Sequence, residues 1–283
     1  MSFPKPYTGF ASPKYHKLEL AAEGVLHMAF NRPPVNAFID PKWQETQAIL
    51  KHVRDDGDVN VIVLSGEGRA FTAGLDLLNA SLSDVMAAQP DAARKAVLMR
   101  RHLADFQEAI SWFEHVEKPV IAAAHGVAFG LAVDIMSACD IRYAAKGTRF
   151  SIKEVDAGLA ADIGTLQRFP KIVGNDSIAR ELALTAREFD ADEALRIGFL
   201  GRIVDGGREE VVAAAIKTAS DIAAKAPVAV RATKIFMLHG RDHSVEEGLR
   251  YTQALNSGLL QSDDLPVAML AVMQKQKPQF AKL

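Results

Sequence analysis

The sequence predicts a mixed α/β fold that continues into a purely helical C-terminal part. Val59–Ser65 and Val120–Ala124 are almost continuously apolar, which is typical of strands covered on both faces. Strand and helix patterns alternate up to about residue 205, and only helical patterns follow from Glu209 to Gln274. Short buried strands mixed with helices indicate α/β layering, and the change of pattern predicts a boundary near residue 206.

Composition limits the class of protein. The 283 residues are 49% hydrophobic and 24% charged, as in ordinary soluble globular proteins. The net charge of −2 disfavours nucleic acid or a membrane surface as the main partner, and no apolar run is long enough to predict a membrane span. Cys139 is the only cysteine, so no intrachain disulfide can form, and its apolar surroundings predict a buried thiol rather than a nucleophile.

The N-terminal elements are predicted from turn signals and periodicity. Residues 1–15 have the pattern of an irregular arm. Lys17–Leu20 and Val25–Phe30 are strand-like and are separated by a Glu-Gly turn signal. Asp40 followed by Pro41 predicts a helix N-cap with proline in the first turn, and this helix should run to about Arg54.

The middle of the chain continues this alternation. The buried strand at 59–65 leads into a glycine-containing turn, and we expect Leu78 to Pro90 to form a mobile loop or short helix over a site. A long helix is predicted from about Asp91 to His115, and a Lys-Pro pair ends it before the buried strand at 120–124. Beyond these, we expect strands at 140–145, 150–152 and 199–204, helices at 162–173, 176–185 and 192–196, and C-terminal helices separated at 227, 240–243 and 263–264.

Three carboxylates, Asp134, Glu154 and Asp162, fall in segments that otherwise resemble apolar core lined by Gly and Ala. Carboxylates are rarely buried without partners, because removing the charge from water is costly. Burial raises a carboxyl pKa toward the range useful for proton transfer, and neighbouring acids raise it further. The sequence therefore predicts proton chemistry in this region.

Each acid also has a structural interpretation. Asp134 could be a carboxylate that the dipole favours near a helix N-terminus. Glu154 could be a surface charge or an ion-pair partner of Lys153. Asp162 could be an N-cap that stabilises the following helix by about 1 kcal/mol. The three acids within thirty residues are better explained together than one by one.

Two small-residue turns follow buried strands, at Ala70–Asp76 and Gly126–Asp134. Such turns expose backbone N–H groups, and two of these converging on one carbonyl oxygen would form an oxyanion hole. Plain strand-to-helix turns explain the pattern equally well. Neither glycine-rich phosphate-binding fingerprint occurs, and the scattered histidines predict no metal site. A Ser-His-Asp triad stays open although GxSxG is absent, while His27 and His125 are interpreted as core residues.

Longer segments carry a family resemblance. FTAGLDL at 71–77, HGVAFGLAVDIMSACDIRYAA at 125–145 and DADEALRIGFLGRIVD at 190–205 resemble the enoyl-CoA hydratase/isomerase, or crotonase, superfamily. Residues 153–175 and 241–249 most resemble its Δ3,5-Δ2,4-dienoyl-CoA isomerases. Those isomerases have three pocket acids, the second twenty residues after the first and the third eight later. Asp134, Glu154 and Asp162 have this spacing, whereas simple hydratases lack the third acid.

The resemblance implies a crotonase-like spiral of repeated ββα units over 1–205 that carries the acyl-CoA site. It implies a helical oligomerisation region over 206–283 that forms trimers or dimers of trimers. The backbone N–H groups of Ala73 and Leu131 would form the oxyanion hole. The usual Gly-Gly-Gly before the first acid is here Gly130-Leu131-Ala132, whose side chains could narrow the pocket or change chain-length preference.

The implied activity is isomerisation of 3,5-dienoyl-CoA to 2,4-dienoyl-CoA in fatty acid β-oxidation. By resemblance Glu154 acts near C2, Asp162 acts near C6 and Asp134 tunes the pair. No metal or redox cofactor is implied, since coenzyme A is part of the substrate. Enoyl-CoA hydratase and Δ3,Δ2-enoyl-CoA isomerase are the alternatives. A non-catalytic binding or RNA-associated protein of the same fold is more remote, because the acids are intact and no basic stripe occurs.

The resemblance also implies substrate contacts, and the C-terminal tripeptide separately indicates a location. Binding residues carried over from the motifs are Ala73, Gly74, Asp76 and Gly130, and candidates for holding the CoA phosphates are Arg32, Lys275 and Lys277. These three cations could equally be ordinary surface charges. The C-terminal Ala281-Lys282-Leu283 resembles the Ser-Lys-Leu import signal. It predicts a free tail, a peroxisomal import receptor as partner and a place in the peroxisomal matrix, with mitochondria or cytoplasm as alternatives.

Overall fold

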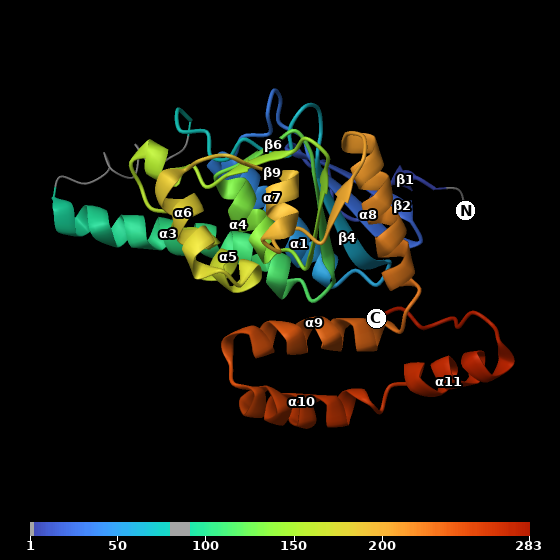
Figure 1. Ribbon diagram of the computed structural model, residues 1–283. Coiled ribbons are helices and arrows are strands. Elements are labelled where there is room, and N and C mark those ends of the chain that lie inside the picture. The colour runs from blue at the N-terminus through green and yellow to red at the C-terminus, as the bar shows by residue number, and fades with distance from the viewer. Residues whose placement is uncertain (1–2, 80–90) are drawn as a thin grey trace.

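The computed structural model describes residues 3–79 and 91–283. Its main sheet, of which Figure 1 labels β1, β2 and β4, has seven strands in the order β1-β2-β3-β4-β5-β7-β10. The first three strands pair antiparallel, and all pairs from β3 onward are parallel. The strands are β1 (Lys5–Pro6), β2 (His16–Ala22), β3 (Gly24–Phe30), β4 (Val59–Gly66), β5 (Val120–Ala124), β7 (Ile141–Ala145) and β10 (Arg202–Val204).

A smaller sheet and a set of helices cover this main sheet. The smaller sheet has the order β6-β8-β9 and is built from β6 (Val127–Phe129), β8 (Arg149–Ser151) and β9 (Phe189–Asp190). The helices are α1 (Asp40–Arg54), α3 (Ala92–His115), α4 (Leu131–Ala138), the 3-10 turn η1 (Glu154–Ala157), α5 (Thr165–Val173), α6 (Asp176–Thr185), α7 (Ala191–Arg196), α8 (Arg208–Ala223), α9 (Pro227–Asp242), α10 (Val245–Leu259) and α11 (Asp264–Gln274).

The central strands are buried on both faces, as the apolar runs predict. Side chains alternate across a strand, so Val61 and Val63 of β4 pack toward α8 in one core cluster. Ile62 and Leu64 pack on the opposite face in the larger cluster that includes α1, α3 and α4. All four side chains are fully buried, and each such burial contributes about 1.5–3 kcal/mol. Helices on both sides of the sheet therefore give the molecule its layers.

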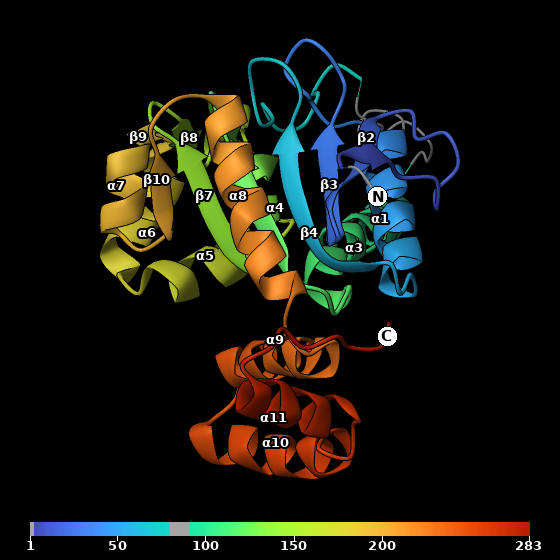
Figure 2. The same cartoon turned by 90° about the vertical axis from the view of Figure 1, so that its right-hand side faces the viewer.

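The helical C-terminal part has two different structural roles. Helix α8 lies across the main sheet (Figure 2), and its buried stripe, Val211, Val212, Ala215 and Ala219, closes the second core cluster. Helices α9–α11 form a separate layer beyond one end of the sheet (Figure 2). The change to helices alone comes near residue 206, as predicted, but α8 is structurally part of the sheet core. An apolar stripe does not reveal which surface it covers.

Most predicted elements agree with the structure, and the differences lie at element ends. Ile39 is the N-cap of α1, so the prediction of Asp40 as N-cap is wrong by one residue. The strand predicted over 199–204 is limited to β10, because residues 199–201 form an irregular bend. Strands β1, β6 and β9 were not predicted, since segments of two or three residues carry no periodicity. Most of the segment predicted at Leu78–Pro90 lies outside the described residues.

The buried polar side chains agree with their structural interpretation. His27 is 6% exposed and contacts Glu19 and Ser65 through its two ring nitrogens. His125 is 5% exposed and its Nε2 lies 2.9 Å from a backbone carbonyl. Cys139 is buried and unpaired, as predicted. Across the described part of the chain, no helix combines the length and apolar character needed to cross a membrane.

Candidate active site

The three acids of the sequence pattern line one cavity of about 180 Å³. Asp134 comes from α4, Glu154 from η1 and Asp162 from the loop before α5. Much of the remaining wall is apolar and includes Leu75, Leu77, Leu103, Phe106, Leu131, Leu159 and Ile163. A concave, largely apolar cavity with a few convergent polar groups is the usual form of a small-molecule site. The structure therefore brings the three acids together in a ligand-sized space.

Asp134 is the most deeply buried of the three, at 1% exposure. It lies in the first turn of α4, but its Oδ1 accepts the backbone N–H of Thr165 from α5, at 2.6 Å. Burial raises the pKa of Asp134 to about 7, and the nearby charge of Glu154 adds to this rise. The hydrogen bond from Thr165 opposes it. Asp134 is therefore poised to gain or lose a proton near neutral pH.

Glu154 lies at the start of η1, and one of its two carboxylate oxygens lacks a hydrogen-bond partner among the described residues. Its Oε2 is buried and forms no hydrogen bond within the described residues. Lys153 instead pairs with Asp156 at 3.1 Å, so the alternative interpretation of Glu154 as an ion-pair partner of Lys153 is not supported. Burial raises the pKa of Glu154, and the charge of Asp162 raises it further. A carboxylate with an unsatisfied oxygen beside a cavity is suited to accept a ligand proton.

Asp162 lies in the loop that precedes α5. The helix begins at Thr165 with Gly164 as its N-cap, so both the predicted helix start and the N-cap interpretation of Asp162 are wrong. The Asp162 carbonyl oxygen accepts a hydrogen bond from Gln107 Nε2 on α3 at 2.6 Å. Burial raises the pKa of the Asp162 carboxyl, and nearby His102 opposes the rise. The third acid is therefore a loop carboxylate in the cavity wall.

Backbone N–H groups are also present at the cavity, but the two that have no acceptor among the described residues are not the pair predicted for the oxyanion hole, Ala73 and Leu131. Ala73 lines the cavity, yet its N–H donates to the Val35 carbonyl at 3.0 Å. In this conformation the N–H of Ala73 is engaged, and the prediction of it as an oxyanion donor is not supported. Leu75 pairs with Phe38 in a parallel bridge, and only the residues flanking Leu75 bond to Phe38. The N–H of Leu75 therefore faces away from Phe38.

Gly74 allows the two small-residue turns to approach closely. Its φ of +93° is a conformation that side chains disfavour. An added Cβ would lie 2.9 Å from the Phe129 carbonyl oxygen and 3.5 Å from the Leu131 nitrogen. Leu131 is the first residue of α4, where a helical N–H has no partner within the helix. Neither Leu75 nor Leu131 donates its N–H in any hydrogen bond between described residues. Together they supply two free backbone donors at the cavity.

Only some of the other residues predicted to contact the substrate line the cavity. Gly74, Gly130 and Leu131 line the cavity as expected. Asp76 lies outside the lining and forms an ion pair with Arg32 at 2.7 Å. Lys275 ends α11 and Lys277 lies in the tail, and neither lines the cavity. The structure therefore does not bring the three proposed phosphate-binding cations to the cavity itself.

Several residues of the site were missed from the sequence. Thr165 holds Asp134 through its backbone, which no side-chain pattern reveals. Leu103 and Phe106 of α3 form part of the apolar wall. Their three-residue spacing indicates one face of a helix, but nothing local identifies the surface that this face covers. Only the tertiary arrangement assigns them to the site.

Comparison with known proteins agrees with this geometry. The family model described as enoyl-CoA hydratase/isomerase matches residues 21–282. The chain belongs to the enoyl-CoA hydratase/isomerase family. The solved structure of an enoyl-CoA hydratase from Bacillus anthracis matches with a TM-score of 0.83 at 26% identity, covering 94% of this chain and 99% of that one. The predicted fold class and family resemblance are thus confirmed.

Within the enoyl-CoA hydratase/isomerase family, two curated relatives are particularly similar. The human protein named mitochondrial Δ(3,5)-Δ(2,4)-dienoyl-CoA isomerase is 42% identical over 258 residues, covering 91% of this chain and 78% of the human one. The Arabidopsis thaliana protein of that name, described as peroxisomal, is 43% identical over 261 residues, covering 92% and 93%. The chain is therefore similar over most of its length to proteins of one named activity.

The raised pKa of Asp134 predicts a pH-dependent effect of Asp134→Asn. The folded pKa exceeds the unfolded one, so protonated Asp134 stabilises the fold below about pH 4. That contribution is lost as pH rises toward 7. The free energy of unfolding of Asp134→Asn, relative to wild type, should therefore increase between pH 4 and pH 8 by on the order of 4 kcal/mol, from about three pKa units. Urea unfolding at a series of pH values measures this difference.

Asp205→Asn is the matched control for Asp134→Asn, because it removes a carboxylate whose side chain is 92% exposed. A difference between Asp134→Asn and wild type that stays constant from pH 4 to pH 8 would contradict the raised pKa.

Proposed function

We propose that this chain is an enzyme that isomerises 3,5-dienoyl-CoA to 2,4-dienoyl-CoA in fatty acid β-oxidation. The observation that carries the proposal is the third acid, since Asp162 lines the same cavity as Asp134 and Glu154. Hydration needs no acid at this third position, according to the family resemblance. The name of the human and Arabidopsis relatives supports the same activity.

The oxyanion hole of this mechanism uses two backbone donors. The thioester oxygen of the substrate accepts the N–H groups of Leu75 and Leu131, two cavity-lining residues whose N–H groups have no acceptor among the described residues. Leu75 takes the role first expected of Ala73, whose N–H is held by Val35. The two donors stabilise the negative charge that develops on the thioester oxygen when a C2 proton leaves. Each such donor typically contributes about 10²–10³-fold to the rate.

Two different carboxyl groups move the protons. Glu154, in its ionised form, removes a proton from C2, and the electron pair of that C–H bond forms a C1=C2 double bond while the C1=O electrons move onto the thioester oxygen of the dienolate. When the dienolate collapses, C1=O re-forms, the C1=C2 electrons move to C2=C3, the C3=C4 electrons move to C4=C5, and the C5=C6 electrons take the proton of Asp162 at C6. One C–H bond breaks and one forms, so the reaction needs no oxidant, reductant or cofactor. Exchange with solvent resets Glu154 and Asp162, while Asp134, whose pKa the charge of Glu154 raises, tunes the pair.

Enoyl-CoA hydratase is the principal alternative, and the third acid distinguishes the two activities. We expect wild type to convert 3,5-octadienoyl-CoA with growth of conjugated dienoyl absorbance and without added cofactor. Asp162→Asn should lower kcat by about 10²–10⁴-fold, because it removes the proton donor to C6. Asp156→Asn is the control, since that carboxylate lies on η1 but outside the cavity lining.

Full activity of Asp162→Asn would contradict the proposed role of Asp162 as the proton donor to C6. Folded wild-type protein that hydrates 2-enoyl-CoA but leaves the dienoyl substrate unchanged would assign the chain to the hydratases instead.

Self-association, as a trimer or a dimer of trimers, is part of the same proposal. Helices α9–α11 contribute no residue to either core cluster of the described chain. They instead expose large apolar side chains, among them Met237, Val245, Leu249, Met269, Val272 and Met273. An apolar surface of this kind is typical of interfaces, and two or more copies of this chain would cover it.

Sedimentation velocity tests the assembly. Wild type should sediment with the mass of three or six copies, and Met269→Glu combined with Met273→Glu should shift it toward one copy, because charges would enter the apolar surface. Leu184→Glu is the control, since Leu184 is equally exposed but lies on α6. Monomeric wild type, or a double variant that assembles normally, would contradict the proposal.

The proposed location is the peroxisomal matrix. Relatives of this activity are described as mitochondrial in human and peroxisomal in Arabidopsis, and the C-terminal tripeptide favours the second. The tail folds back onto the body, where Lys282 pairs with Asp58 and Arg231 donates to the Leu283 carbonyl at 3.3 Å. Lys282 and Asp58 are both largely exposed. Such surface pairs stabilise little, so an import receptor can displace them.

Microscopy of a protein tagged at its N-terminus tests this location. Deleting Leu283 should leave the protein in the cytosol, and Lys282→Arg, which keeps the small-basic-Leu pattern, should leave it in peroxisomes. Peroxisomal accumulation of the truncated protein would contradict the proposed signal.

A further inference from the structure

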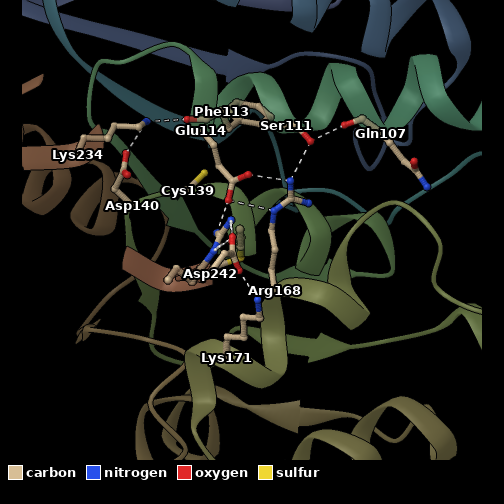
Figure 3. Close-up of polar contacts among 12 residues, drawn as sticks. Gln107, Ser111, Phe113, Glu114, Cys139, Asp140, Arg168, Lys171, Lys234 and Asp242 are labelled. Atoms are coloured by element: carbon tan, nitrogen blue, oxygen red, sulfur yellow. Dashed lines mark hydrogen bonds and ion pairs between the residues drawn. The ribbon is translucent and has the colours of Figure 1, made fainter. Parts of the chain in front are cut away.

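Arg168 of α5 is partly exposed and lies near Asp134, although the proposed proton transfers do not use it. Its side chain is 11% exposed and forms a two-pronged ion pair with Glu114 of α3 (Figure 3). Nε lies 3.1 Å from Glu114 Oε1, and Nη2 lies 2.8 Å from Oε2. Nη2 also donates to Ser111 Oγ at 2.9 Å. Paired contacts of this kind fix the orientation of a guanidinium as well as its position.

This guanidinium covers the start of α5. A Cβ added to Gly164 would lie 1.9 Å from Arg168 Nη1, so the glycine leaves the space that the arginine fills. The next residue, Thr165, donates its N–H to Asp134 at 2.6 Å. Arg168 therefore packs against the residue that immediately precedes the N–H that holds Asp134.

A second set of contacts reaches the other end of the same loop. The Ser111 hydroxyl donates to the Gln107 carbonyl at 2.8 Å. Gln107 Nε2 in turn donates to the Asp162 carbonyl at 2.6 Å. Figure 3 shows Gln107, Ser111 and Glu114 along α3, facing Arg168. Both ends of the loop from Asp162 to Thr165 are thus tied to α3.

Glu114, the ion-pair partner of Arg168, also contacts α9. Glu114 is 6% exposed and pairs with Arg241 near the end of α9 as well as with Arg168. Lys234, two helical turns earlier on the same face, donates to the Phe113 carbonyl at 2.8 Å and to Asp140 at 2.9 Å. A buried carboxylate needs such partners, because an unpaired charge there is costly. Arg241 and Lys234 therefore hold α9 against the end of α3 at which Glu114 also binds Arg168.

We propose that Arg168 is a positioning residue that fixes the loop from Asp162 to Thr165, and that the Glu114–Arg241 ion pair makes this position depend on the docking of α9. The inference deepens the proposed isomerase function, and its kinetic readouts rest on that function. It links the proposed assembly surface on α9–α11 to the acids of the site through a continuous chain of contacts.

Two variants of Arg168 distinguish the effect of the position of its guanidinium on kcat from the effect of its charge. Arg168→Met and Arg168→Lys both lose the two-pronged contact, so kcat should fall about 10- to 100-fold, while KM changes far less. The charged groups that face Asp134 are Glu154 from η1 and Arg168 itself. Arg168→Met should therefore move the midpoint of the pH–kcat profile upward, because a cation that favours ionised Asp134 is lost. Arg168→Lys should leave the midpoint near that of wild type.

Three further variants make the test specific. Lys171→Met is the matched control, because it removes a solvent-exposed ion pair with Asp242 between the same two helices, and kcat should not change. Gln107→Met changes an exposed residue that leaves Glu114 paired, and it should lower kcat even if Arg168→Met folds poorly. Arg241→Met should lower kcat less than Arg168→Met, since it acts through Glu114.

Hydrogen exchange of the Thr165 amide supplies a readout that needs no turnover. It should be faster in Arg168→Met and Gln107→Met than in wild type or Lys171→Met. Unchanged exchange, or a lower melting temperature with unchanged kcat at 25 °C, would overturn the positioning role, and so would an equal loss of kcat in Lys171→Met. Wild type without dienoyl conversion would refute the proposed function alone, and the exchange rates would still decide the positioning role.

Discussion

The burial of three carboxylates against one cavity is the constraint on which the rest of this structure depends. Asp134 is almost completely enclosed and its pKa is raised to about 7, while burial also raises the pKa of Glu154 and Asp162. Such groups are destabilising when ionised. One backbone N–H from Thr165 and the charge of Arg168 offset part of this cost at Asp134. Glu154 Oε2, beside the cavity, has no hydrogen-bond partner among the described residues.

The layers of the fold set the position of this cavity. Central strands with helices on both faces supply a rigid apolar core, and the small-residue turns that follow β4 and β5 reach the cavity from its edge. Gly74 lets these turns approach each other closely, and Leu75 and Leu131 both line the cavity. Helix α3 supplies the apolar residues Leu103 and Phe106 to the cavity lining and, through Glu114, contacts both α5 and α9. One helix therefore connects the substrate cavity to the proposed assembly surface.

The sequence predicted the elements and the acids better than it predicted the connections between them. Apolar runs identified β4 and β5, and the spacing of Asp134, Glu154 and Asp162 identified the cluster, because both are properties of contiguous segments. The oxyanion donor was placed at Ala73 instead of Leu75, since the bond from Ala73 to Val35 depends on a bridge between distant segments. The Arg168–Glu114–Arg241 contacts were not foreseen for the same reason, as they join residues 54 and 127 positions apart.

Isotope labelling in D₂O tests most directly the central claim that one carboxyl group removes a proton and another delivers one. Wild type should place solvent deuterium at C6 of the 2,4-dienoyl product, because the proton on Asp162 exchanges with solvent before each delivery. NMR of the isolated product locates the label. A product whose C6 carries only the hydrogen that left C2 would contradict the claim, since a single group would then have carried that hydrogen between the two carbons.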